Sequence, residues 1–145
     1  MPNDSRLLRY FVVVACLAMA VVGCGDRGPT RVAVTGAVKL DGKPVEQGSI
    51  SFVPPEGSDN PAASAEIKAG EYALPVTSGP AVGQYRIEIR WSRPTGKKVK
   101  MGSPAPPGTM VDEVREAVPA KYNTKSTLER EVSEGDNTLD FDLDS

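Results

Sequence analysis

Apolar and polar side chains alternate along several short stretches of the chain. In residues 84–91, four apolar side chains share one phase and four polar or charged side chains share the other. Residues 32–40 and 139–143 alternate in the same way, and 50–52 and 72–76 are shorter examples. A period of two is typical of a β-strand that buries one face. These stretches are therefore predicted to be half-buried strands.

Turn-forming residues separate these stretches. Asp41-Gly42 is a dipeptide typical of tight hairpins, and Gly70 precedes another apolar stretch. Weaker strands are predicted at residues 63–68 and 127–132. Six or seven short strands with glycine-rich turns and little helical periodicity predict an all-β fold, an antiparallel β-sandwich of about seven strands.

Residues 92–118 interrupt this pattern. The segment holds four prolines and three glycines, so one long loop is predicted there. A short helix capped by Thr109 is an alternative for its later part. The apolar residues at helical spacing are Met110, Val111, Val114 and Val118. Because long loops on rigid scaffolds commonly carry binding, function is expected in this segment.

The N-terminus has the composition of an export signal. Arg6 and Arg9 precede residues 10–22, which carry no charge, and small residues follow. This uncharged stretch has thirteen residues, fewer than the roughly 20 that a membrane-spanning helix needs. A helical signal peptide is predicted over residues 1–23. An uncleaved anchor and a cleaved, soluble secreted protein are the alternatives.

The motif Val21-Val22-Gly23-Cys24 resembles the lipobox of bacterial lipoproteins. That resemblance implies cleavage before Cys24 and attachment of a diacylglycerol to its thiol, usually followed by acylation of the freed amine. Residues 24–31 then form a lipid-bearing tether, and residues 32–145 form the folded domain.

Charge and cysteine content exclude several classes of protein. Without residues 1–23 the chain has 15 basic and 18 acidic side chains, whereas a nucleic-acid-binding protein shows a clustered basic footprint. The chain has no histidine, and its two cysteines are Cys16, which leaves with the signal, and Cys24. Zinc sites, Cys–His nucleophiles and histidine-based catalysis therefore lack their residues. No serine-hydrolase or phosphate-loop motif occurs. A protein that is not an enzyme is expected, with no metal and no cofactor apart from the covalent lipid.

Two features are candidates for binding. Lys97, Lys98 and Lys100 cluster in the predicted loop and suit anionic headgroups or cell-wall polymers, with a merely solubilising role as the alternative. Tyr122 lies in a turn-like segment, whereas the other aromatic residues that could stack on a sugar occupy the inward phase of strands. These four residues form the predicted interaction set.

Three aspartates alternate along the last predicted strand. They are Asp140, Asp142 and Asp144. Calcium requires six to eight converging oxygens, and one strand face does not supply them. A solvated acidic face is predicted here.

Several segments of the domain resemble carboxypeptidase-regulatory-like domains, which are transthyretin-like, or prealbumin-like, sandwiches. The segments are VTGAV at 34–38, DGKPV at 41–45, GSISF at 48–52, GEYAL at 70–74 and VGQYRI at 82–87. The closing stretch, PAKYN at 119–123 and GDN at 135–137 through Phe141, is similar to a large set of small lipoproteins in planctomycete-type bacteria. The matching residues belong to turns and core. The resemblance therefore implies a fold and no chemistry.

Together these observations predict a non-catalytic, lipid-anchored β-sandwich module of the cell envelope with a structural or protein-interaction role. The alternative is a glycan- or peptide-binding module that works through loops at one end of the sandwich. The expected partners are the membrane, through the lipid, and an envelope protein or glycan, but not nucleic acid. Gly25 follows Cys24 and Asp26 comes one position later. This order leaves the cell membrane and the outer membrane both open as the destination on the exported side.

Overall fold

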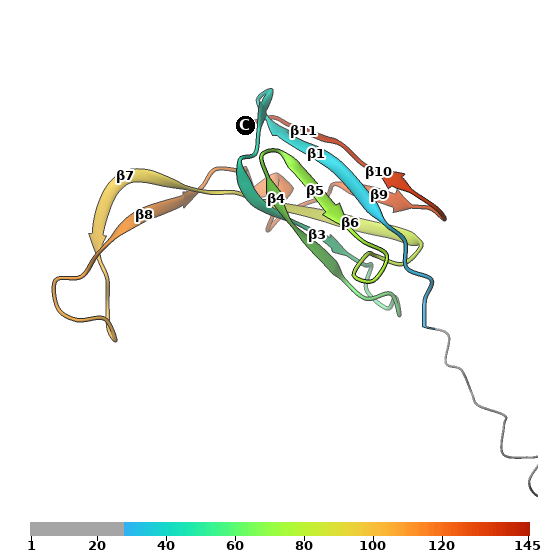
Figure 1. The fold of residues 1–145 in the computed structure, drawn as a ribbon, viewed down its shortest axis with the longest axis horizontal. Helices are drawn as coiled ribbons and strands as arrows, with labels where there is room; N and C mark the ends of the chain where they lie inside the picture. Colours follow the sequence, from blue (N-terminus) through green and yellow to red (C-terminus); the bar gives the residue numbers. More distant parts are fainter. Residues whose placement is uncertain (1–27) are drawn as a thin grey trace, which may run out of the picture.

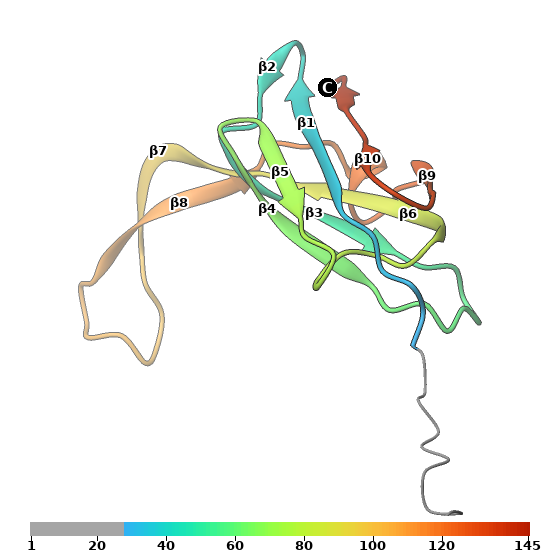
Figure 2. The ribbon, with the colours of Figure 1, turned by 45° about the vertical axis from the view of Figure 1, so that its right-hand side comes forward.

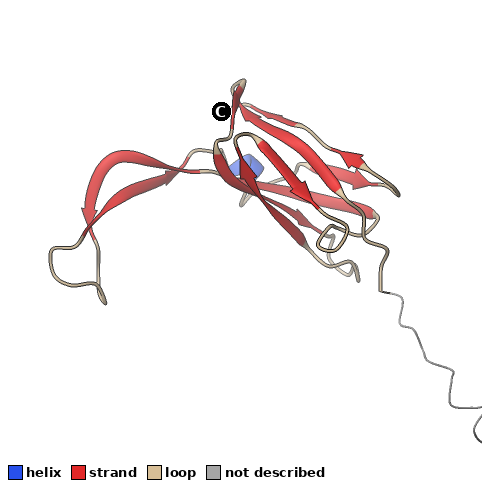
Figure 3. Cartoon of the chain, viewed as in Figure 1, coloured by secondary structure: helices blue, strands red, loops and turns tan. Residues whose placement is uncertain are grey.

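The computed structural model of the protein describes residues 28–145, and the predicted signal peptide and Cys24 lie outside the described residues. Residues 28–145 form eleven strands and one turn of 3-10 helix, η1 (Ala120–Tyr122). The all-β prediction is confirmed, and Figure 3 shows how little of this part of the chain is helical. None of its helical structure is long and apolar enough to cross a membrane.

Nine of these strands form one curled sheet (Figures 1 and 2). They are β1 (Val34–Leu40), β2 (Lys43–Pro44), β3 (Gln47–Val53), β4 (Ala63–Lys68), β5 (Glu71–Leu74), β6 (Gly83–Arg90), β9 (Glu129–Val132), β10 (Asn137–Thr138) and β11 (Phe141–Leu143). Their order is β10-β1-β5-β4-β3-β6-β9, and β2 and β11 pair with the second half of β1. The edge strands β9 and β10 follow one another in the chain. The curl therefore brings the two edges of the sheet together at one short turn.

The last two strands of the chain depart from the predicted antiparallel arrangement. Both β10 and β11 run parallel to β1. Between them the chain bulges, so that the Leu139 carbonyl lies close over Gly36 and the Asp140 carboxylate accepts the Ala37 N–H at 2.7 Å. No hairpin links a pair of parallel strands, so local alternation carries no information about this direction.

Apolar side chains from both halves of the sheet fill its inner face. The inward phase predicted for β6 is confirmed, because Tyr85, Ile87 and Ile89 are at most 1% exposed. Phe52 of β3 packs edge-on against Tyr85, with ring centroids 6.1 Å apart. Further buried members of this core are Val34, Val38, Ile50, Ile67, Leu74, Val132, Phe141 and Leu143. The described residues thus share one continuous core.

The predicted glycine turns are confirmed. Asp41 and Gly42 both have positive φ angles, 51° and 74°, which a two-residue type I′ hairpin requires. Ala69 and Gly70 repeat this geometry between β4 and β5, with φ angles of 53° and 84°. The strand predicted over residues 72–76 is shorter in the structure, and the last apolar residue of that pattern, Val76, is not buried. Its side chain is 55% exposed because β5 ends two residues earlier.

The prediction for residues 92–118 is wrong, both as one long loop and as a loop containing a helix. Two strands form a hairpin here, β7 (Ser92–Lys100) and β8 (Met110–Glu116), which projects from the sheet (Figure 1). Residues 101–109, between the two strands, form an irregular loop. The spacing of Val111 and Val114 suggested a helix, but pairing with β7 decides for a strand because context overrides local propensity. We call residues 92–116 the arm and residues 101–109 its tip.

Candidate functional site

The root of the arm is fixed to the sheet by Trp91 and Glu116. One oxygen of the Glu116 carboxylate accepts the N–H groups of Trp91 and Val118, at 2.8 and 3.0 Å. The Trp91 carbonyl accepts the Ala117 N–H at 2.8 Å, and the Arg93 guanidinium lies 4.7 Å from the centre of the buried Trp91 ring. Hydrogen bonds to a charged acceptor are stronger than neutral ones. The direction of the arm is therefore set by specific contacts at its base.

Beyond the root, the arm is a ribbon of two strands with little burial on either face. Its register runs from Ser92 opposite Glu116 to Lys100 opposite Met110, with an irregularity between Pro94 and Lys98. Almost all of its side chains are exposed and none is buried. Its backbone pairing stabilises the ribbon without a core of its own. Such a projecting ribbon suits contact with another molecule.

Two side-chain contacts link the strands of the arm. The Thr95 hydroxyl donates to a carboxylate oxygen of Glu113 at 2.6 Å. The Lys98 ammonium lies 3.0 Å from a carboxylate oxygen of Asp112, and both side chains are more than half exposed. Exposed ion pairs contribute little stability, typically about 0.2–1 kcal/mol. The arm is therefore stiffened mainly by its backbone hydrogen bonds.

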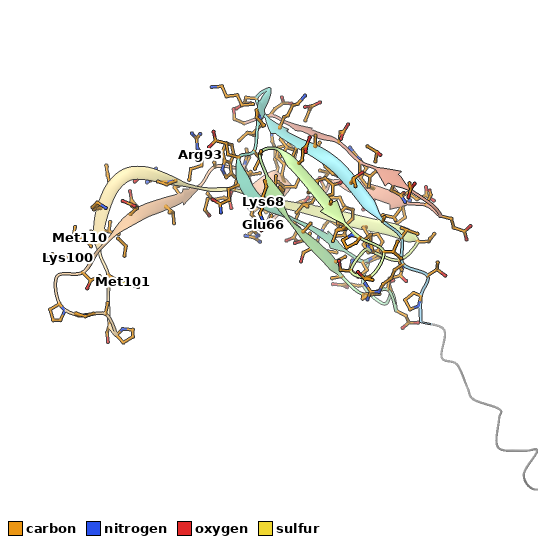
Figure 4. The ribbon with its side chains drawn as sticks, in the orientation of Figure 1. Glu66, Lys68, Arg93, Lys100, Met101 and Met110 are labelled. Atoms are coloured by element: carbon orange, nitrogen blue, oxygen red, sulfur yellow. The ribbon has the colours of Figure 1, made fainter. Side chains whose placement is uncertain are left out.

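Exposed apolar side chains are concentrated on the arm. Among residues 28–145, six large apolar side chains are exposed, and four of them belong to the arm or its tip. These four are Val99, Met101, Met110 and Val114, with exposed fractions of 40, 52, 47 and 60%. Figure 4 labels both methionines at the far end of the arm. Gathered exposed apolar surface commonly marks an interaction site.

The structure places the three predicted lysines together, on β7 next to the tip. Lys97, Lys98 and Lys100 precede residues 101–111, a stretch without any charged side chain. Five basic and three acidic side chains give the arm a net charge of +2, whereas nine basic and fourteen acidic side chains give the rest of residues 28–145 a net charge of −5. The arm is thus the cationic part of an anionic domain.

Tyr122, the fourth predicted site residue, belongs to a different place. It is half-buried in η1, where its ring packs against the core. Its hydroxyl oxygen accepts the Asp144 N–H at 3.3 Å, and the Lys121 ammonium lies 5.0 Å from the ring centre. The bond from Asp144 ties Tyr122 to the segment that follows β11. The structure therefore does not join it to the three lysines.

The other aromatic residues are core residues, as expected for their strand phase. Tyr72, Tyr85 and Trp91 are at most 7% exposed. The Tyr72 hydroxyl donates to the Leu139 carbonyl at 2.8 Å, and burial, together with the nearby Asp140 carboxylate, raises its pKa. Burial also raises the pKa of Tyr85, whose oxygen accepts the Ala81 N–H at 3.0 Å. These side chains have structural partners and form no exposed sugar-stacking platform.

The acidic face of the last strand is solvated, as predicted. Asp140, Asp142 and Asp144 are all exposed, and Asp140 already accepts a backbone N–H. Within residues 28–145, no group of three or more Asp, Glu, His or Cys side chains could hold a metal ion. The carboxylates of this face therefore have no geometry for binding a cation among the residues described.

Two shallow hollows lie on the sheet, away from the arm. One, of about 560 Å³, lies over the small residues Gly36, Ala37 and Ala73. At its rim the Lys68 ammonium pairs with the Glu66 carboxylate at 2.8 Å (Figure 4). The second, of about 540 Å³, lies at one end of the sheet. Its lining includes Val53, Pro54, Pro55, Gln84, Arg86 and Glu129. The end of the sheet thus offers a small polar and apolar surface to an extended ligand.

Sequence reasoning found the lysines but missed the ribbon that carries them and its exposed methionines. In residues 110–116 apolar and charged side chains occur in both phases, with Val111 in one and Met110 and Val114 in the other, so no period of two indicated a strand. The site that emerges is a cationic ribbon with an uncharged, partly apolar tip.

In comparisons with known proteins, no family model, no curated protein and no solved structure matches this chain.

Proposed function

We propose that this protein is an exported, lipid-anchored module of the bacterial cell envelope that acts by binding, without catalysis, and that the arm is its interaction element. The observation that carries the proposal is the arm itself. It projects from a domain with an otherwise well-filled core, and it holds four of the six exposed large apolar side chains of residues 28–145. Rigid scaffolds that present one long excursion commonly bind through it.

The anchor is supported by the lipobox-like motif at the N-terminus. Its cysteine, Cys24, lies four residues before the first described residue, Gly28. A diacylglycerol on the thiol and an acyl chain on the amine would hold the protein stably, because each buried methylene contributes roughly 0.8 kcal/mol and a single chain binds only marginally. The anchor lies on the exported side of the cell membrane or of the outer membrane.

A transthyretin-like sandwich, of the type found in carboxypeptidase-regulatory-like domains and small planctomycete-type lipoproteins, is part of this proposal. The segments that carry the resemblance form strands and turns in the structure. Residues 41–45 contain the Asp41-Gly42 turn, residues 48–52 lie in β3, and residues 70–74 form the turn and strand β5. The all-β, curled sheet is compatible with such a sandwich.

The alternative function is binding of a glycan or peptide at one end of the sheet. The hollow of about 540 Å³ beside Pro54, Pro55 and Arg86 favours it, since it combines apolar rings with a guanidinium. In this case the arm would be a spacer. Substitution of Arg86 separates the two functions, because this residue lies on β6 of the sheet and not on the arm.

The experiment compares the intact protein with a variant that lacks most of the arm. Residues 94–114 are replaced by Asn-Gly, so that the paired residues Arg93 and Arg115 flank a two-residue hairpin. Mass spectrometry of the mature protein should show an acylated Cys24 in both. The rate of transfer from isolated envelopes to an excess of acceptor vesicles is then measured. The variant should transfer faster than the intact protein.

Two results would contradict this function. An unmodified Cys24 in a soluble protein would remove the anchor. Equal transfer rates with and without the arm, combined with faster transfer of an Arg86→Glu variant, would move the interaction to the end of the sheet. Glu46→Gln serves as a surface control and should leave the transfer rate unchanged, because Glu46 is exposed and lies outside both surfaces.

A further inference from the structure

The exposed apolar side chains of the described chain gather in two places. Four lie on the arm, and the other two are Val76 and Val82, in the connection between β5 and β6. This connection packs against the segment through which the chain enters the domain. The Val82 N–H donates to the Thr30 carbonyl at 3.3 Å, and the Val32 N–H donates to the Pro80 carbonyl at 3.0 Å. The second place is therefore beside the tether.

Both places lie on the same side of the domain. Figures 1 and 2 differ by a turn about the vertical axis, so heights are comparable between them. In both views the tip of the arm and the first described residues are the lowest parts of the coloured ribbon, whereas the C-terminus and the turn between β1 and β2 are at the top. One flat surface beneath the domain can therefore touch the tip and the start of the domain together.

The tip, together with the first two residues of β8, has the chemistry of a segment that enters a membrane interface. Residues 101–111 carry no charge, and they include the exposed Met101 and Met110. Lys97, Lys98 and Lys100 lie directly behind them on β7. Lysine side chains can place their stems along apolar surface and their ammonium groups at the headgroups, and a basic residue near an anionic surface is favoured.

The charge of the molecule points to an anionic partner at this place. The arm carries +2 and the rest of residues 28–145 carries −5, so an anionic surface attracts the arm and repels most of the sheet. We propose that the arm binds the surface of an anionic lipid bilayer, the same bilayer that holds the lipid on Cys24. The domain then touches the membrane at two points. This proposal rests on the proposed lipid anchor.

The fixed root makes such a second contact effective. Because Glu116 and Trp91 set the direction of the arm, little freedom is lost when the tip reaches the bilayer. The anchor also keeps the tip near the membrane at high effective concentration. A contact too weak to recruit the domain by itself therefore suffices to orient it.

The test places one fluorescent label at each end of the domain. Cys24 is consumed by lipid and Cys16 is removed with the signal, so Ser103→Cys and Ser145→Cys each give the mature protein a single free thiol. Ser103 lies in the tip, and Ser145 is the C-terminal residue on the opposite side. Each protein is labelled with an environment-sensitive dye and mixed with vesicles of phosphatidylglycerol and phosphatidylcholine whose acyl chains are brominated.

We expect the dye at position 103 to shift to the blue and to be quenched, and the dye at position 145 to do neither. The effect at position 103 should weaken in phosphatidylcholine alone. The double variant Lys97→Gln with Lys100→Gln should lower the ratio of inserted to free tip about fivefold for each lysine removed. This factor corresponds to ~1 kcal/mol per basic residue. The matched double control, Lys39→Gln with Lys43→Gln, should leave this ratio unchanged because both lysines belong to β1 and β2 at the other end.

The outcomes separate this proposal from the anchor. Co-flotation with vesicles and the mass of the N-terminus report on the lipid. If the protein floats but the dye at position 103 is not quenched, the anchor stands and the proposal is overturned. If the protein is not acylated, the anchor is refuted, and the labelled domain is then held on the same anionic vesicles by an N-terminal His tag and a nickel-chelating lipid, where absence of quenching overturns the proposal. A dye response that follows protein concentration without vesicles, with dimers in sedimentation, would assign the arm to a second copy and also overturn it.

Discussion

Gly36 is a position where one added methyl group should clash with the backbone between β10 and β11. A Cβ at this position would overlap the Leu139 carbonyl oxygen, would lie 2.7 Å from the carbonyl carbon, and would lie 3.0 Å from Cε1 of Tyr72. The oxygen and carbon belong to the backbone and cannot rotate away. Gly36→Ala should therefore push the bulge between β10 and β11 off β1.

The cost follows from the hydrogen bonds that hold this bulge. The Leu139 N–H donates to Thr35, the Tyr72 hydroxyl donates to the Leu139 carbonyl, and the Ala37 N–H donates to Asp140, at 2.8, 2.8 and 2.7 Å. Each contributes roughly 0.5–1.5 kcal/mol net. Replacing glycine by alanine also stabilises the folded protein by about 0.4–1 kcal/mol, because it lowers the conformational entropy of the unfolded chain. The expected net loss in the free energy of unfolding is about 0.5–4 kcal/mol.

Urea unfolding of the purified mature protein measures this loss, with Gly102→Ala as the matched control. Gly102 has no heavy atom within 4 Å of its added Cβ, so its variant should stay within about 0.5 kcal/mol of the parent. Hydrogen exchange of the Ala37 and Leu139 amides should accelerate in Gly36→Ala. If both variants unfold at the same urea concentration with unchanged exchange, the parallel docking of the last strand on β1 is refuted.

The remaining predictions concern the core, one buried hydroxyl and the root of the arm. Ile87→Ala should lower the free energy of unfolding by roughly 2–5 kcal/mol, because it leaves a cavity among fully buried side chains. The exposed Gln84→Ala on the same strand should change it by less than about 0.5 kcal/mol, and equal losses would contradict the strand phase. Burial raises the pKa of Tyr72, so the native state keeps a proton that the unfolded chain loses above its pKa of about 10. The contribution of this hydroxyl to the free energy of unfolding is therefore complete below about pH 10 and is lost as the pH rises further. Tyr72→Phe should flatten this fall, and an unchanged pH profile of unfolding would refute the assignment. Glu116→Ala leaves two backbone N–H groups at the root of the arm without their acceptor. The arm should then be cleaved faster by trypsin than in the parent, and equal cleavage rates would show that the root does not depend on this carboxylate.

The amino-acid sequence by itself determined the local features of this protein. Alternation placed Tyr85, Ile87 and Ile89 on the inner face, and the structure buries all three. The Asp41-Gly42 dipeptide specified its turn, because positive φ angles at both positions are tolerated by few other residue pairs. Both features depend on neighbours within a few residues. For the same reason, the three lysines of the candidate site could be named in advance.

Tertiary structure decided how distant segments meet. The parallel docking of β11 on β1 pairs Val38 with Phe141. The hydrogen bond from the Ala37 N–H to the Asp140 carboxylate forms only when these two segments are adjacent. The arm is a ribbon because β7 and β8 pair with each other. Pro94 within β7 and the glycines between the two strands had suggested a loop. Tyr122 is separated from the lysines for the same reason, since its bond with the segment that follows β11 positions it. Local patterns specify which face of a strand is buried, whereas pairing direction, edge position and projection from the sheet arise from contacts between segments far apart in the chain.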